Sequence, residues 1–193
     1  MNWLAHLVLS EPNPRFRIGN LLPDLVPVSA LNGLSADFLR GVQQHRQIDS
    51  FADRHAIVRQ SIRRVPENFR RFGGILVDMF YDHFLSRDWP KFSITPLPVF
   101  VDEIHASFAR HRNEVPPEAC VHLDRIRAGN LLCSYGELSG LSTALKRIGL
   151  RLRRPAPLSE AVSVLEGDYA GFHADFHSFF PEIISHLARP NNP

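Results

Sequence analysis

The sequence has few cysteines, no strong net charge and no long hydrophobic run. Its 193 residues include two cysteines, Cys120 and Cys133, which are too few for a disulfide framework and lack zinc-finger spacing. A net charge of +2 does not predict a nucleic-acid-binding surface. The N-terminus lacks the basic start and apolar run of a signal peptide, and it reaches Glu11 too soon to span a bilayer. We therefore expect a cytoplasmic protein with two buried cysteines and neither a membrane nor a nucleic-acid partner.

Hydrophobic residues make up 44% of the chain, a proportion typical of a globular protein. They recur mainly at steps of three and four residues, without the alternation of a strand, so the sequence predicts an all-α fold. No linker or repeat divides the chain, and we expect a single compact multi-helix domain over residues 1–193. The predicted helices cover residues 2–9, 19–24, 35–63, 67–88, 96–112, 117–133, 137–150 and 158–188. Ser35 is expected to cap the third, Gly73 and Gly74 to weaken the fourth, and Pro181 to break or bend the last.

Four pairs of polar residues in the first half are each separated by four positions. A helix places both members of such a pair on one face. Apolar residues surround these pairs, and a carboxylate in apolar surroundings is costly unless it is paired, hydrogen-bonded or bound to a metal. The pairs are Asn2 with His6, Asn20 with Asp24, His45 with Asp49, and Asp78 with Asp82.

Imidazole and carboxylate groups together suit manganese, iron or zinc, and the lack of thiolate candidates argues against a structural zinc site. Structural interpretations remain open for individual residues: His6 or His83 could be a satisfied buried histidine, and Asp24 a helix cap. His173 and His177 have the spacing of a metal-binding pair, but the phenylalanines around them favour a packing helix.

Four blocks in the first 90 residues carry a resemblance to a known family. In order they read MNWLAHL at 1–7, GNLLPD at 19–24, HRQIDSFAD at 45–53 and DMFYDHFL at 78–85, followed by Trp89. With a looser match through Tyr135, Leu141 and the basic run at 146–154, the sequence resembles the acyl carrier protein phosphodiesterases. The resemblance implies an all-helical fold similar to the HD-type metal phosphohydrolases. It also implies manganese-dependent removal of 4'-phosphopantetheine from holo acyl carrier protein.

We expect the first half of the chain to supply the chemistry. Asp49 would orient His45 or the attacking water, Arg46 would hold the phosphate as a bidentate donor, and His6 would protonate the leaving oxygen. The expected metal ligands are Asp24, His45, Asp78, Asp82 and His83.

The basic run in the second half is the expected contact surface for an acidic carrier protein, through Arg147, Arg151 and Arg154. These arginines could equally form a solvated helix face. Two other functions stay open at this point: a metal phosphohydrolase acting on a nucleotide or other small phosphodiester, and a noncatalytic helical binding module.

Overall fold

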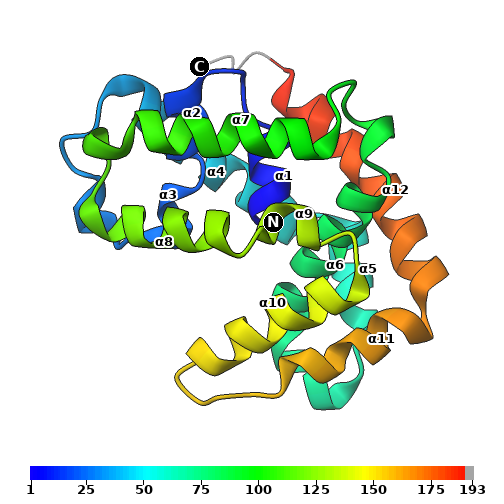
Figure 1. The fold of residues 1–193 in the computed structure, drawn as a ribbon. Helices are drawn as coiled ribbons and strands as arrows, with labels where there is room; N and C mark the ends of the chain where they lie inside the picture. The colour runs from blue at the N-terminus through cyan, green and yellow to red at the C-terminus, as the bar shows by residue number, and fades with distance from the viewer. Residues whose placement is uncertain (190–193) are drawn as a thin grey trace.

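The computed structural model describes residues 1–189, and within that range it is built from helices and 3₁₀ turns (Figure 1). The predicted all-α class is confirmed. The α-helices are α1 (Trp3–Val8), α2 (Pro14–Gly19), α3 (Leu22–Leu25), α4 (Ala36–Arg54), α5 (Ala56–Arg64), α6 (Gly73–Arg87), α7 (Leu97–Arg110), α8 (Pro117–Ala128), α9 (Leu131–Ser134), α10 (Leu138–Arg151), α11 (Val162–Gly167) and α12 (Tyr169–Leu187).

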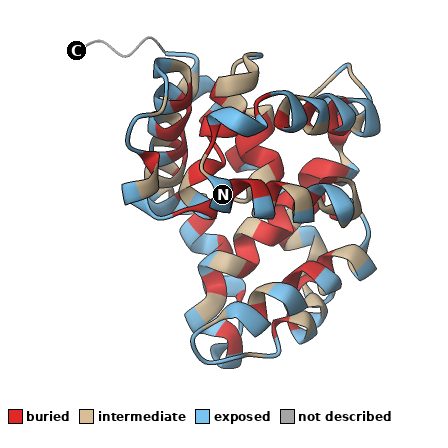
Figure 2. Cartoon of the chain, turned by 60° about the vertical axis from the view of Figure 1, so that its left-hand side comes forward, coloured by how far each residue is buried: buried red, intermediate tan, exposed pale blue. Residues whose placement is uncertain are grey.

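Helix α6 is the central element of the fold. Every residue from Met79 to Ser86 is buried, so this helix is covered on all sides rather than on one stripe. Helices α1, α5, α10 and α12 pack around it. Figure 2 shows the resulting pattern, in which buried segments run through the middle of the molecule and exposed ones lie at its periphery. The side chains of Asp82 and His83 on α6 are therefore enclosed by protein.

Helices α2 and α4 pack unusually closely because a glycine lies on each side of their contact. A Cβ atom at Gly19 would lie 2.2 Å from the carbonyl oxygen of Phe38, and one at Gly41 would lie 2.1 Å from that of Phe16. No side chain fits at these distances. This contact fixes the position of Asn20, directly after α2, relative to His45, one turn beyond Gly41.

The predicted helix over 35–63 is two helices. The chain leaves the helical conformation at His55 (φ −71°, ψ 133°), and the ring of His55 accepts a hydrogen bond from the Ile57 amide at the start of α5. Ser35 precedes the first helical residue as predicted, but its side chain makes no capping hydrogen bond.

The predicted helix at 19–24 is also wrong. Asn13 caps a separate helix, α2, which Pro14 begins, and Pro23 lies in the first turn of α3. Asn20 falls between the two helices, where its side chain is free to turn towards α1.

Other boundaries follow local backbone chemistry. As predicted, Gly73 marks a break, where a 3₁₀ turn (Glu67–Phe72) gives way to α6. Asn130 adopts a left-handed conformation (φ 45°) and divides the predicted 117–133 helix into α8 and α9. The last predicted helix breaks at Asp168, whereas Pro181 lies inside α12.

Cys120 is buried as expected, but Cys133 is only partly so. Among residues 1–189, no helix combines the length and the apolar character needed to cross a membrane.

Candidate metal centre

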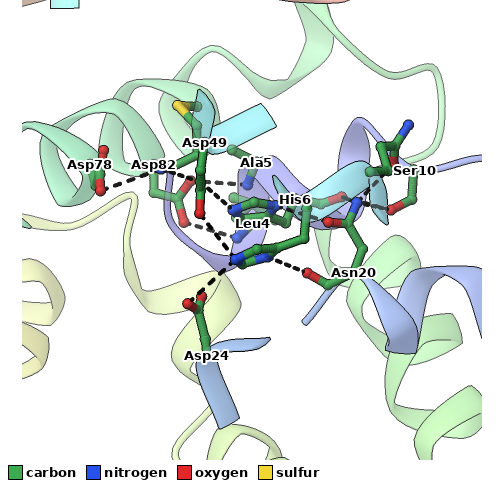
Figure 3. Close-up of polar contacts among 12 residues, drawn as sticks. Leu4, Ala5, His6, Ser10, Asn20, Asp24, Asp49, Asp78 and Asp82 are labelled. Carbon is green, nitrogen blue, oxygen red and sulfur yellow. Dashed lines mark hydrogen bonds and ion pairs between the residues drawn. The ribbon is translucent and has the colours of Figure 1, made fainter. Parts of the chain in front are cut away.

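A polar cluster lies where α1, α3, α4 and α6 approach one another (Figure 3). His6 comes from α1, Asp24 from α3, and His45 and Asp49 from α4. Asn20 reaches the cluster from the connection between α2 and α3. The fold thus brings together residues from three of the four pairs predicted from the sequence.

The two histidines of the cluster are stacked. Their ring centroids are 4.2 Å apart and their planes are inclined by 13°. Each ring presents Nε2 to one oxygen of the same carboxylate: His6 Nε2 lies 3.3 Å from Asp49 Oδ1, and His45 Nε2 lies 3.0 Å from Asp49 Oδ2. His45 Nε2 also lies 3.7 Å from an oxygen of Asp24.

Asn20 sets the tautomer of both rings. Its main-chain carbonyl accepts from His45 Nδ1 at 2.8 Å, and its side-chain Oδ1 lies 3.0 Å from His6 Nδ1. The amide Nδ2 points to Ser10 Oγ and Gln44 Oε1, both at 2.8 Å, which leaves Oδ1 facing His6 as an acceptor. Since oxygen acceptors occupy both Nδ1 atoms, each Nδ1 carries a proton and each neutral ring has its lone pair on Nε2.

Two lone pairs directed at a carboxylate are unfavourable unless a positive charge lies between them. Within residues 1–189, the Nε2 atom of His6 is fully buried and lacks a hydrogen-bond partner. A proton can satisfy one such nitrogen, and a divalent cation can satisfy both together with the carboxylates. A hydrogen bond at Nδ1, on the side of the ring away from a coordinating Nε2, is the usual support of a histidine ligand. The residues therefore fit a divalent metal ion.

The carboxylates are the part of the cluster that is exposed to solvent. The histidine side chains are at most 5% exposed, whereas those of Asp24 and Asp49 are each 37% exposed. The side chain of Asp78 is 34% exposed. The amino group of Met1 lies between two carboxylates, 3.3 Å from Asp78 Oδ2 and 3.1 Å from Asp49 Oδ1. A ligand entering from solvent thus meets oxygen atoms first, with buried nitrogens behind them.

The same geometry shifts the pKa values of the two histidines in opposite directions. Burial lowers the pKa of His6. Burial acts on His45 too, but its hydrogen bond to Asp49 and the nearby Asp24 raise the pKa of His45 above the ordinary value. Although burial opposes it, the two histidines hold the pKa of Asp49 well below its usual range. Asp49 is thus an anion in the folded protein.

Asp82, expected as a metal ligand, has both oxygens engaged elsewhere. They accept hydrogen bonds from the backbone amides of Leu4 and Ala5, at 2.9 Å and 3.0 Å. Asn2, at the N-cap position of α1, makes no capping bond, so Asp82 supplies this cap from another helix. Burial raises the pKa of Asp82 to about 7, although the two amides favour its charged form. Asp82 supports His6 through the position of α1.

Replacing Asp82 with alanine should therefore lower the free energy of unfolding by about 1–3 kcal/mol, since two buried amides lose their acceptor. Urea unfolding with a chelator present measures this loss in the absence of metal. Asp53→Ala, which removes an exposed carboxylate from α4, is the matched control and should change stability by less than about 0.5 kcal/mol. Equal losses in the two variants would contradict the capping role.

The structure does not bring His83 or Arg46 to the cluster. His83 is buried on the other side of α6, with Nδ1 at 2.8 Å from the Tyr135 carbonyl and Nε2 at 2.9 Å from the Tyr169 hydroxyl. Arg46 is exposed and lines a separate hollow of about 490 Å³ with Ser50. Residues next to each other on a helix diverge by about 100°, so Arg46 and His45 lie on different faces.

Three supporting residues were missed as site residues: Asn20, Ser10 and Gln44. Asn20 had a signal in the sequence, because it belongs to one of the four polar pairs. Ser10 and Gln44 had none, because both act through hydrogen bonds to Asn20 that form only in the folded chain.

The fold and the site together define a class of protein: an all-helical protein whose histidine and aspartate cluster opens to solvent. The sequence model of the acyl carrier protein phosphodiesterases matches residues 1–183, and the chain belongs to this family.

Curated relatives carrying that name cover nearly the whole chain. The Photorhabdus laumondii protein is 32% identical over 95% of this chain and 93% of its own length. The Salmonella agona protein is 30% identical over 98% of both chains, and the Pectobacterium atrosepticum protein is 28% identical over 95% and 96%. No solved structure matches the chain. The expected likeness to HD-type phosphohydrolases therefore stays a prediction.

Proposed function

We propose that the protein hydrolyses the phosphodiester between 4'-phosphopantetheine and a serine of holo acyl carrier protein, releasing apo carrier protein, with a divalent metal ion at the described cluster. One observation carries the proposal: two buried imidazoles, each hydrogen-bonded at Nδ1, direct their Nε2 atoms towards carboxylates that open to solvent. The names of the relatives supply the substrate.

The ligand set that we propose is His6, His45, Asp49 and Asp24, with manganese as the expected ion. His6 moves into this set from its expected role as a proton donor. Its Nε2 is buried and its lowered pKa keeps the ring neutral near pH 7, which suits a ligand better than an acid. Asp78 remains a candidate at the edge of the cluster.

The remaining chemistry is divided among the protein's own groups. A bound ion would neutralise charge on the phosphoryl group and lower the pKa of water. Asn20 holds both imidazoles in the required tautomer, and Asp82 fixes the helix that carries His6. The partly exposed carboxylate of Asp78, beside Asp49, lies where a proton from the attacking water can be accepted.

Metal affinity should increase with pH. The pKa of His45 is raised, so its Nε2 still carries a proton at pH values above the ordinary histidine pKa. This proton competes with the metal, and metal binding releases it. Below this pKa the affinity should fall about tenfold per pH unit, and above it the affinity should level off. Calorimetric titration with manganese in buffers of different ionisation enthalpy measures both the affinity and the proton released. A flat profile from about pH 6 to 8 would contradict the role of His45 as a ligand.

A groove next to the cluster suits an acidic protein carrying a flexible arm. It has a volume of about 520 Å³, and Arg125, Arg147, Arg151 and the exposed Leu150 line it together with Trp3. Trp3 is two residues from Met1, whose amino group contacts Asp49 and Asp78. Figure 1 shows the N-terminus beside α8 and α9, with α10 below. Arg154, also expected at the partner surface, is exposed beyond the end of α10 but is not part of the groove wall.

Reversing the charge of Arg147 and Arg151 should lower kcat/KM for holo acyl carrier protein by about tenfold or more, mainly through slower association. Hydrolysis of a small generic phosphodiester should stay within about twofold of wild type. Arg63→Glu with Arg110→Glu makes the same charge change on exposed positions of α5 and α7 and is the control. Unchanged carrier-protein hydrolysis in Arg147→Glu/Arg151→Glu would place the docking surface elsewhere.

The direct test is mass spectrometry of holo acyl carrier protein incubated with enzyme and manganese. Conversion to the apo mass supports the proposal. Hydrolysis of nucleotides or small phosphodiesters without conversion would assign the same cluster to a different substrate. No hydrolysis of either, with no bound metal, would leave a noncatalytic binding module.

A further inference from the structure

A second convergence of metal-ligating side chains lies away from the first. Asp88 ends α6, while His173 and His177 lie one turn apart on α12. His173 Nε2 is 2.8 Å from Asp88 Oδ2, His177 Nε2 contacts the same oxygen, and the two Nε2 atoms are 3.0 Å apart. Three ligand atoms from two helices therefore point to one place.

Hydrogen bonding alone satisfies these groups poorly. Two N–H groups aimed at one oxygen and separated by 3.0 Å repel each other, and a ring without that proton directs its lone pair at a carboxylate. A shared cation removes both conflicts. Zinc–nitrogen bonds of about 2.0–2.1 Å at a tetrahedral angle hold two imidazole nitrogens about 3.3 Å apart, a small adjustment from the separation here.

The rings are also held in place before any ion binds. His173 packs at the edge of Phe84, with centroids 5.0 Å apart, and stacks on Tyr169. His177 stacks on Phe92 at 6.1 Å. The side chains of the three candidate ligands are 20–38% exposed, so an ion can enter and retain water. The competing cation, Lys91, is 60% exposed and its Nζ lies 3.2 Å from Asp88, on a flexible chain that can move away.

We propose that Asp88, His173 and His177 bind a divalent transition-metal ion of the zinc type, which ties the end of α6 to the middle of α12. Two imidazoles and a carboxylate match the donor preference of zinc. The site shares no residue with the first cluster. Asp78 and Asp88 are ten residues apart along α6, and a helix rises about 15 Å over that length. The proposal is thus independent of the carrier-protein activity.

Zinc titration in an Asp49→Asn background tests the site, because that substitution removes the carboxylate shared by the first cluster. Asp49→Asn should retain one zinc equivalent, which raises its melting temperature. Adding His173→Gln and His177→Gln should abolish both the equivalent and the temperature shift. Adding Asp88→Asn, which removes one charge and keeps the shape of the side chain, should give the same result and serves if the histidine variant folds poorly.

His186→Gln is the matched control, an exposed histidine on the same helix outside the cluster, and it should leave the equivalent unchanged. The proposal is overturned if Asp49→Asn binds no zinc. It is also overturned if its zinc equivalent survives in folded variants that lack Asp88 or the two histidines.

Discussion

Asp49→Asn is expected to lose manganese binding and to lower turnover by roughly 10²–10⁴-fold. Asparagine has nearly the same shape, but it removes the anion that both Nε2 atoms face at 3.0–3.3 Å and presents one oxygen in place of two. No other side chain of the cluster contacts both histidines at Nε2 in the described part of the chain. Calorimetry with manganese and steady-state turnover measure the two effects.

Asp53→Asn is the control for this variant, since it changes an exposed carboxylate one turn further along α4. Its metal affinity and turnover should match the wild-type values. Wild-type manganese affinity in folded Asp49→Asn would refute the assignment of the cluster as the metal centre.

Gly41→Ala is expected to lower the free energy of unfolding by about 1–3 kcal/mol, because the new methyl group meets backbone atoms that cannot yield. Its Cβ would lie 2.1 Å from the Phe16 carbonyl and 2.7 Å from the Asn20 amide nitrogen. The strain therefore reaches the residue that orients both histidines, and turnover should fall as well. Thermal unfolding should show a decrease of roughly 2–4 °C for each kcal/mol lost.

Gly74→Ala is the matched control, because a Cβ atom at Gly74 meets nothing within 4 Å and alanine favours the helix. It should leave stability equal or slightly higher. A wild-type melting temperature for Gly41→Ala would mean that α2 and α4 do not pack as closely as described.

The sequence predicted the helices well, because the apolar spacing of three and four residues survives in the fold. Their breaks were harder to predict. The chain turns at His55 and Asp168, where a side chain caps the next helix, and continues through Pro181. Capping at these positions depends on backbone angles that a pattern of apolar residues does not specify.

The cluster was predictable only in part. Spacing of four residues correctly placed His45 and Asp49 on one face, but it could not say which helix that face would meet. Asp82 shares a face with Asp78, yet it meets the amides of α1 instead of a ligand position.

Long-range pairing explains the remaining omissions. Asp88 lies 85 residues before His173, and only the packing of α12 against α6 brings them together. The spacing of His173 and His177 therefore gave two of the three residues of the second cluster, and the buried phenylalanines beside them confirm the predicted packing role of that helix.

Hydrolysis of holo acyl carrier protein in oxygen-18 water, with manganese and the wild-type enzyme, tests the central claim most directly. Attack of water at phosphorus breaks the bond to the serine oxygen, so the label should appear in released 4'-phosphopantetheine, and the apo carrier protein should stay unlabelled. Asp49→Asn should give neither product. Label in the carrier protein, or conversion that is unaffected by Asp49→Asn, would contradict the proposed chemistry at this cluster.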